Sequence, residues 1–167
     1  MKKSSWIVSC LAVLLAGQIA ASAASTNAVY TVTADSAFRA GKIKANPSYT
    51  ATVLFYSDGT CELVVAGFTL TGTYETSTNG KQIILTDTTN KAALESSIAA
   101  LIADQAPGAT ITVKNVKWSK ITLNKTTGAP TQATDTVSGK GCEGKHCRSF
   151  TLKTLWTNWT LISGTNI

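Results

Sequence analysis

The residues best suited to chemistry are two cysteines that flank the only histidine of the chain. Cys142 and Cys147 are five positions apart, and Gly144 lies between them. A glycine turn of this length can bring the two Cα atoms to the about 5–6 Å that a disulfide needs. The spacing therefore predicts a Cys142–Cys147 disulfide. Because its loop is short, this disulfide should stabilise the fold by less than the roughly 3 kcal/mol expected for a 15-residue loop.

A metal site or a cysteine nucleophile is the alternative use of this segment. With Glu143 and His146, the two cysteines offer two sulfurs, one nitrogen and one oxygen. Structural zinc needs four firm ligands, and in so short a segment the adjacent His146 and Cys147 would both have to turn inward. A Cys–His nucleophile pair also needs a third group that orients the base, and none is evident. We therefore predict no metal and expect His146 to be an exposed turn residue.

Nothing else in the sequence indicates catalysis. Hydrolysis by paired carboxylates needs two acids in one cleft, but the nine acidic residues are scattered and Asp58 belongs to a predicted turn. The chain has no phosphate-binding loop, no Gly-x-Ser-x-Gly elbow and no His-Glu-x-x-His motif. We predict a protein that is not an enzyme and holds no cofactor.

Three tryptophans are the remaining candidates for ligand contact, namely Trp118, Trp156 and Trp159. Tryptophan can anchor a sugar or an apolar ligand, but it is more often part of the core because it buries a large area. Trp156 and Trp159 have odd spacing, so on one continuous strand they would point to opposite faces. We expect one of these two side chains in the core and the other exposed.

The N-terminal segment has the three parts of an export signal. Lysines precede an apolar run from Trp6 to Ala16, and small residues ending in Ala23 follow. The run is shorter than the about 20 residues that cross a bilayer. We expect residues 1–23 to be a signal peptide and residues 24–167 to form one β-rich domain, exported to the periplasm or the medium. A retained N-terminal anchor is the alternative, and no later apolar run predicts a transmembrane segment.

Export places the remaining cysteines in an oxidising compartment. Cys10 would leave with the signal, and its lipidation is not expected because most of the apolar run follows it. Cys61 is then left without a partner by the predicted disulfide. We interpret it as a small buried hydrophobe on the same face as Tyr56. The alternatives are pairing with one of the two other cysteines, or an intermolecular bond.

The amino-acid composition favours β-strands, and the net charge does not identify a binding partner. The chain has 27 threonines, and the branched Cβ of threonine suits a pleated surface. Without the two lysines of the signal, 13 basic and 9 acidic residues give a net charge of about +4. Such a charge permits attraction to anionic lipid, lipopolysaccharide or nucleic acid. Because the lysines are scattered along the sequence, ordinary solubility explains them and no nucleic-acid partner is expected.

Two hairpins are the clearest local units. Asp58-Gly59 separates the runs 50–56 and 61–66, and a two-residue loop there would place Tyr56 opposite Cys61. Leu54 would then face Leu63. Asn79-Gly80 separates the runs 68–75 and 81–87 in the same way. This second loop would place Tyr74 opposite Leu85 and Thr76 opposite Ile83.

One helix interrupts the strands. Leu94, Ile98, Leu101 and Ile102 recur at helical spacing, Asn90 is the predicted N-cap, and the segment closes at residues 107–108. The apolar stripe should cover one face or one open end of a sheet. A helix that lies on a membrane is the alternative, and its single cation fits that interpretation poorly.

The other strands complete an all-β prediction. Shorter strands are expected at 29–33 and 38–44, a long run at 109–123, a polar edge strand at 132–138 and two final strands at 148–155 and 156–163. Many short strands with close turns indicate a mainly antiparallel meander that forms a barrel or sandwich. We predict an all-β fold with one short α-helix.

Three short segments resemble lipocalin-like (calycin) extracytoplasmic domains. They are Asp58-Gly59-Thr60, Gly72-Thr73-Tyr74 and the run from Gly80 to Thr86. The chain differs from true lipocalins because it lacks an N-terminal Gly-x-Trp and carries a helix in mid-chain. The resemblance implies a barrel with an apolar cavity, and it transfers no functional residue.

These observations support two main hypotheses about function. The first is an exported barrel that binds an apolar or amphipathic ligand. The second is a structural or surface-interaction protein of the cell envelope or extracellular matrix. A third hypothesis, an outer-membrane barrel, predicts lipid-facing alternation over long strands, and the polar stretches 76–81 and 126–138 fit it poorly.

Overall fold

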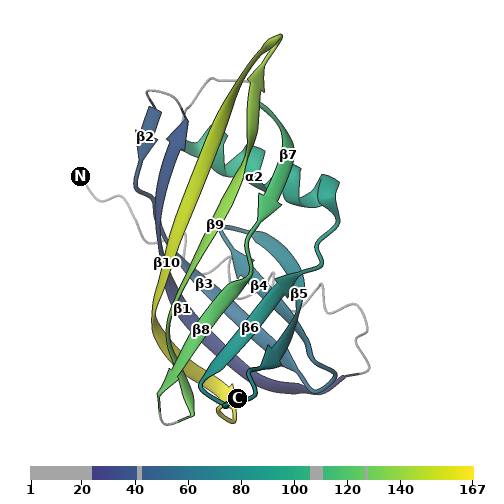
Figure 1. Ribbon diagram of the computed structural model, residues 1–167, viewed down its shortest axis with the longest axis vertical. Helices are drawn as coiled ribbons and strands as arrows, with labels where there is room; N and C mark the ends of the chain where they lie inside the picture. The colour runs from purple at the N-terminus through teal and green to yellow at the C-terminus, as the bar shows by residue number, and fades with distance from the viewer. Residues whose placement is uncertain (1–23, 41–42, 106–110, 127) are drawn as a thin grey trace, which may run out of the picture.

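Strands that bury every second side chain form the wall of the molecule. The computed structural model describes residues 24–40, 43–105, 111–126 and 128–167 (Figure 1). The predicted signal peptide, residues 1–23, lies outside the described residues. The strands and the helix, in chain order, are β1 (Thr26–Ala40), β2 (Ile43–Ala45), β3 (Ser48–Tyr56), β4 (Thr60–Val65), β5 (Phe68–Thr76), β6 (Gln82–Asp87), α2 (Lys91–Gln105), β7 (Thr112–Trp118), β8 (Ile121–Thr126), β9 (Ala129–Glu143) and β10 (His146–Gly164).

Eight of these strands close into an antiparallel barrel. The order around the wall is β10-β1-β3-β4-β5-β6-β8-β9, and β9 pairs with β10 to complete the ring. β2 lies beside β1, and β7 lies beside the upper part of β9 (Figure 1). Apart from the β10–β1 pair that closes the ring, strands adjacent in the ring follow one another in sequence, with only β2, α2 and β7 inserted between them. The fold class predicted from the sequence is confirmed.

The core fills the barrel from alternate strand positions. Along β1, the side chains of Ala28, Tyr30, Val32 and Ala34 are buried, and the residues between them are partly exposed. This is the two-residue periodicity of a strand with one face in the core. The largest fully buried side chains are those of Tyr30, Phe55, Ile83, Leu123, Val32 and Val53.

Helix α2 covers the interior at the upper end of the barrel, the end at the top of Figure 1. Asn90 caps it as predicted, because its Oδ1 accepts the backbone N–H of Ala92 at 2.9 Å. Leu94, Ile98 and Ile102 are buried in the core, which confirms the predicted apolar stripe. The predicted end at residues 107–108 lies outside the described residues. In the part of the chain that the structure describes, no helix is long and apolar enough to cross a bilayer.

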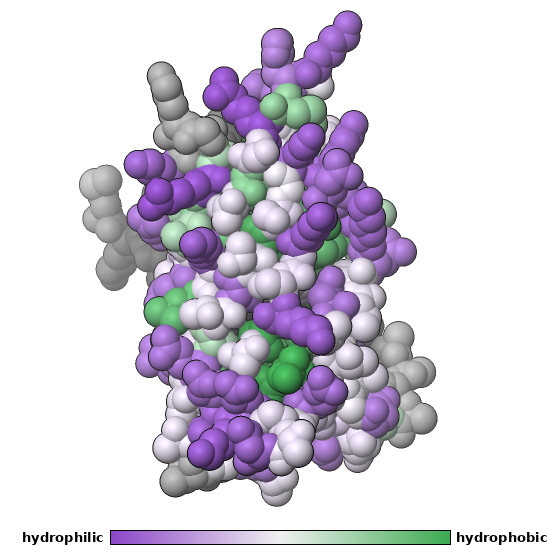
Figure 2. Space-filling view, in the orientation of Figure 1, coloured by the Kyte–Doolittle hydropathy of each residue, from purple (hydrophilic) through white to green (hydrophobic). Residues whose placement is uncertain are grey.

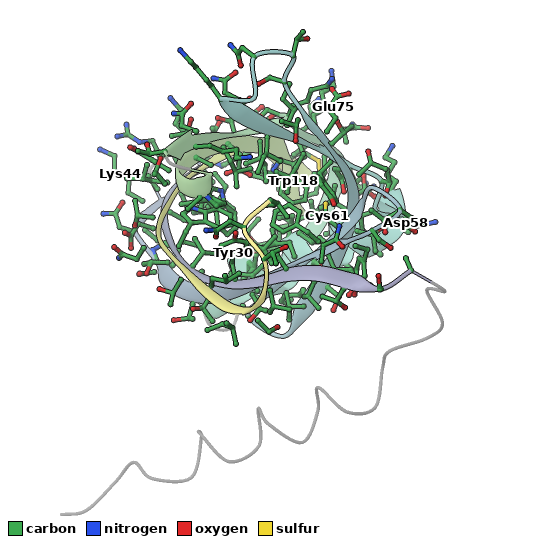
Figure 3. The ribbon with its side chains drawn as sticks, turned by 90° about the horizontal axis from the view of Figure 1, so that it is seen from below. Tyr30, Lys44, Asp58, Cys61, Glu75 and Trp118 are labelled. Carbon is green, nitrogen blue, oxygen red and sulfur yellow. A yellow bond between two sulfur atoms is a disulfide. The ribbon has the colours of Figure 1, made fainter. Side chains whose placement is uncertain are left out.

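Residues 165–167 lie at the lower end of the barrel. The Tyr30 hydroxyl donates to Asn166 Oδ1 at 2.9 Å, and the Thr165 N–H donates to the carbonyl of Asn27 at 3.0 Å. Ile167 packs against the core. Seen from below, this segment curls across the opening next to Tyr30 (Figure 3). The interior is therefore covered at both ends.

The two hairpins differ in how well local sequence predicted their register. At the Asn79-Gly80 turn, Tyr74 pairs with Leu85 and Thr76 with Ile83, as predicted.

At the Asp58-Gly59 turn, the predicted register is wrong by one residue. Cys61 pairs with Phe55, and Leu63 pairs with Val53. The loop is longer because the Gly59 N–H bonds to the Tyr56 carbonyl and Gly59 has a φ of 83°. A slip of one residue exchanges the two faces of a strand, so Phe55 and Val53 point inward in place of Leu54.

Three strand predictions in the second half also needed correction. The run 132–138, predicted at an edge, lies inside β9, which pairs with β10 on one side and with β7 and β8 on the other. The run 109–123 divides into β7 and β8, because β9 changes partner near Ser119. The two final strands are one continuous strand, β10, which reaches along the full height of the barrel (Figure 1).

A β-bulge corrects the prediction for Trp156 and Trp159. Asn158 has a φ of 56°, and the register between β1 and β10 shifts between Thr31 and Thr33. The extra residue changes which face the following side chain takes. Trp156 is buried, and Trp159 packs against the core with its ring 5.9 Å from that of Tyr30. Both indoles therefore point inward.

The positive φ at the bulge predicts how substitutions at position 158 change stability. Asn158→Val should lower the free energy of unfolding by about 1–2 kcal/mol relative to Asn158→Gly, because a branched side chain disfavours the left-handed region. Both variants lose the bond from Asn158 Nδ2 to Thr33 Oγ1, so their difference isolates the backbone effect. Urea unfolding followed by tryptophan fluorescence measures it. Equal stabilities for the two variants would contradict the assignment.

Candidate interior binding site

Three polar residues form a row across the inner wall of the barrel. Ser36 on β1 pairs with Thr154 on β10, and Thr154 pairs with Asp135 on β9. All three side chains are buried. The hydroxyl oxygens of Ser36 and Thr154 are 3.1 Å apart, so one donates to the other. Cross-strand register thus brings together residues that lie far apart in the sequence.

Two tryptophans hold the carboxylate of Asp135. The indole Nε1–H of Trp118 donates to Asp135 Oδ2, and that of Trp156 donates to Oδ1 at 3.2 Å. Trp118 is the last residue of β7 and lies where β9 changes partner, so its side chain can enter the barrel (Figure 3). Each carboxylate oxygen therefore has an indole donor. These hydrogen bonds offset part of the energetic cost of burying a carboxylate.

Burial dominates the electrostatics of this carboxyl. Desolvation raises the pKa of Asp135 to about 6 from 3.8, and hydrogen bonds from Trp118, Trp156 and Thr154 offset part of that rise. Withdrawal from water disfavours the charged form, and donors to the carboxylate favour it. Asp135 therefore titrates within a pH range where an ordinary aspartate is fully ionised.

An apolar cavity of about 50 Å³ adjoins this cluster. Leu94, Ile98 and Leu101 of α2 line it from one side. The other lining residues come from the barrel wall and include Ala34, Val137, Asp135 and the two indoles of Trp118 and Trp156. Three voids of about 10 to 20 Å³ share lining residues with it, Leu63 in two of them and Ile98 in the third. The interior is thus less than fully packed around one ionisable group.

The structure brings together two of the three tryptophans proposed from the sequence. Trp118 and Trp156 meet at Asp135, whereas Trp159 lies lower in the barrel, beside Val53 and Leu123. Among the described residues, the Trp159 Nε1 is the buried side-chain nitrogen without a hydrogen-bond partner. An unpaired buried donor costs about 1–3 kcal/mol.

The cysteine segment lies apart from the interior site. The Cys142–Cys147 disulfide is present, with a Cα–Cα distance of 4.0 Å, and it joins β9 to β10 near their turn. His146 is exposed beside it. Among the described residues, no group of three His, Cys, Asp or Glu side chains could hold a metal ion.

Cys61 is unpaired and buried, in agreement with its interpretation as a small hydrophobe. It pairs with Phe55 across the strands, and not with Tyr56 as the shorter loop would require. Burial raises the pKa of its thiol to about 12. A thiol with so high a pKa is a poor nucleophile at neutral pH.

Asp135 is the site residue that sequence reasoning missed. It lies in a polar run that was predicted as an edge strand, and edge strands tolerate charged side chains. A signal was present, because Ala133, Asp135 and Val137 alternate with hydroxyl and other polar residues. If this run is an inner strand, that alternation places the carboxyl on the core face.

The fold and the interior site define a closed antiparallel β-barrel with an internal, mainly apolar cavity and one buried carboxyl. No protein-family model, no curated protein and no solved structure matches the chain.

The raised pKa of Asp135 predicts a distinctive dependence of stability on pH. The folded protein binds this proton more tightly than the unfolded chain, so the stabilisation is present below about pH 4 and is lost as the pH rises through about 6. Replacement Asp135→Asn removes the effect. Between these pH values, the stability of the variant relative to the wild type should rise by as much as about 3 kcal/mol, at about 1.4 kcal/mol per pKa unit.

Urea unfolding at a series of pH values measures this difference. Asp58→Asn is the control, because hydrogen bonds from Thr60 hold the pKa of the exposed Asp58 below its usual value. That variant should lose stability relative to the wild type as the pH rises through the range below 4, which is the opposite sign. If the free energy of unfolding changed with pH equally in the wild type and in Asp135→Asn, the pKa of Asp135 would not differ between the folded and unfolded chain.

Proposed function

We propose that the protein is a non-enzymatic, lipocalin-like binding module that holds an apolar or amphipathic ligand inside the barrel. The observation that carries this proposal is the cavity of about 50 Å³, whose lining is apolar apart from a few polar groups gathered around Asp135. Ligand sites commonly combine a mostly hydrophobic lining with a small number of placed polar groups. A lining of this kind suits a ligand with an apolar body and a single polar end.

The buried carboxyl favours one kind of polar end. With a pKa of about 6, Asp135 is largely ionised at neutral pH, and its oxygens accept hydrogen bonds. A ligand amine or hydroxyl can donate to these oxygens. A ligand carboxylate would meet a like charge at low dielectric and be repelled. We therefore expect amines and alcohols to bind in preference to acids.

The size of the cavity limits the ligand. An engineered apolar cavity of about 150 Å³ accommodates benzene, so about 50 Å³ admits only a smaller group. A larger ligand requires the neighbouring voids to join. Leu63 and Trp118 lie between the cavity of about 50 Å³ and one of these voids, and residues of α2 lie between it and another. A shift of these side chains or of α2 would enlarge the site.

The alternative is a structural or surface-interaction protein of the envelope or matrix. The covering of both barrel ends and the small cavity favour it. The two functions differ in one measurable respect, which is whether the interior takes up a small molecule.

Displacement of an apolar fluorescent probe by straight-chain amines, alcohols and carboxylates of equal length tests the binding proposal. Amines and alcohols should displace the probe more effectively than carboxylates. Ala34→Leu fills the cavity and should weaken binding by at least about tenfold, which corresponds to about 1.4 kcal/mol. Ala37→Leu adds the same atoms on the outer face of the same strand and should leave binding unchanged.

Thermal unfolding of both variants shows whether each remains folded. If the wild type binds neither the probe nor any member of the series, the structural alternative is favoured. Equal affinity for Ala34→Leu and Ala37→Leu would show that the probe binds somewhere other than this cavity.

Export is a separate proposal that rests on the N-terminal pattern. Cleavage near Ala23 would yield a chain that starts at Ala24 and carries one disulfide and one free thiol. Mass spectrometry of the protein from an exported fraction, with and without alkylation, should find that mass less two hydrogens. Recovery of the full-length chain from membranes would instead support a retained anchor.

A further inference from the structure

Six exposed cations gather on the outer wall of five neighbouring strands. We call this surface the basic face. It extends over β2, β1, β10, β9 and β7, which pair in that order. Its members are Lys44, Arg39, Lys153, Lys140, Lys114 and Lys117.

Cross-strand register places two pairs of these cations directly opposite each other. Lys114 on β7 pairs with Lys140 on β9, and Arg39 on β1 pairs with Lys44 on β2. Like charges at directly opposed positions of an antiparallel pair destabilise the sheet. Lysines that are scattered along the sequence are thus brought together on one surface. The two directly opposed pairs of cations lower the stability of the fold.

Few carboxylates balance this charge. In the described ranges, the one ion pair within 4.0 Å joins Lys91 to Glu95 within the helix and includes none of the six cations. Asp35 lies at the margin of the face and accepts a hydrogen bond from the Ser48 hydroxyl at 2.6 Å. Glu143 lies at the β9–β10 turn. The basic face therefore lacks internal counter-ions and is suited to an external anion.

We propose that the basic face binds the phosphate headgroups of anionic phospholipids at a membrane surface. Five strands at about 4.8 Å spacing make a surface about 20 Å wide. Ser138 and Thr151 lie in the same cross-strand row, between Arg39 and Lys117. Their hydroxyls can donate to phosphate oxygens, and clustered cations are attracted to anionic leaflets.

The chemistry of the face favours lipid headgroups over other partners. Phe38, Phe150 and Trp156 of these strands are buried in the core, and the partly buried Trp118 and Trp159 pack against it. Base stacking, on which single-stranded nucleic-acid binding depends, therefore has no platform here. Among the described residues, the large exposed apolar side chains are Leu161 and Ile162, which lie near the other end of β10. Adsorption at the level of the headgroups, without insertion, follows from this composition.

The figures agree with this placement. The view in Figure 2 faces β7, β9 and β10, and hydrophilic side chains project from the upper part of that side among smaller, less polar residues. Lys44 points away from the barrel, whereas Tyr30 and Trp118 lie within the ring of strands (Figure 3). The basic face and the interior site are therefore on opposite sides of the same wall.

Vesicle sedimentation of the chain that starts at Ala24, the form expected after export, tests the proposal. Vesicles of phosphatidylcholine alone should leave the protein in solution, and vesicles that also contain phosphatidylglycerol should bind it. Added salt should weaken the binding, because the charges are exposed. Single-stranded and double-stranded oligonucleotides and a soluble anionic polysaccharide serve as competitors.

A pair of double variants with equal charge separates the face from net charge. Lys44→Glu with Lys140→Glu should weaken binding to the anionic vesicles by at least about tenfold. Lys81→Glu with Lys125→Glu makes the same charge change near the lower turns and should alter binding by less than about twofold. The first variant should also melt at a higher temperature than the wild type, because each glutamate is placed opposite a cation.

Three results would overturn the proposal. Equal losses in the two double variants would show that only net charge matters. Binding to phosphatidylcholine alone would show that the charges are not the cause. Tighter binding to an oligonucleotide or to the polysaccharide than to vesicles would assign the face to another polyanion.

Discussion

Strand β10 closes the barrel, and its two sets of backbone pairs fix how the wall, the core and the outer surface are arranged. This strand pairs with β1 along one side and with β9 along the other, so it joins the first part of the wall to the last. Closure satisfies the backbone groups that an open sheet would leave unpaired at its edges. β10 carries its bulge at Asn158, just beyond Trp156, the last residue that it pairs with β9.

The interior follows from this closure. Bringing β1, β10 and β9 side by side places Ser36, Thr154 and Asp135 in one row and surrounds a carboxyl with apolar side chains. Hydrogen bonds from the two indoles offset part of the cost of removing the carboxylate from water. The pKa of Asp135 is still raised because desolvation outweighs these bonds. A fold selected for stability alone could place a hydrophobic residue at position 135 and avoid that cost. The retained carboxyl is the reason to look for function in the cavity.

The five strands of the basic face, which include β1, β10 and β9, have different residues on their inner and outer faces. Their inward residues build the core and the polar row, and their outward residues present cations to the solvent. The alternation of a strand allows one wall to carry two unrelated chemistries. The opposed cation pairs outside and the buried carboxyl inside both reduce stability, so each is more easily explained by interaction with another molecule than by folding.

Local interactions between residues close along the chain account for the features that could be predicted. The all-β class, the helix with its Asn90 cap, the register at Asn79-Gly80 and the Cys142–Cys147 disulfide could all be predicted, because spacing within a few residues sets their geometry. Long-range strand pairing is needed to explain the inward turn of Trp159, the interior position of β9 and the meeting of Asp135 with Trp118 and Trp156. These depend on which distant strands pair and where a bulge falls. No short run of residues encodes either, because the pairing joins segments that are far apart in the sequence.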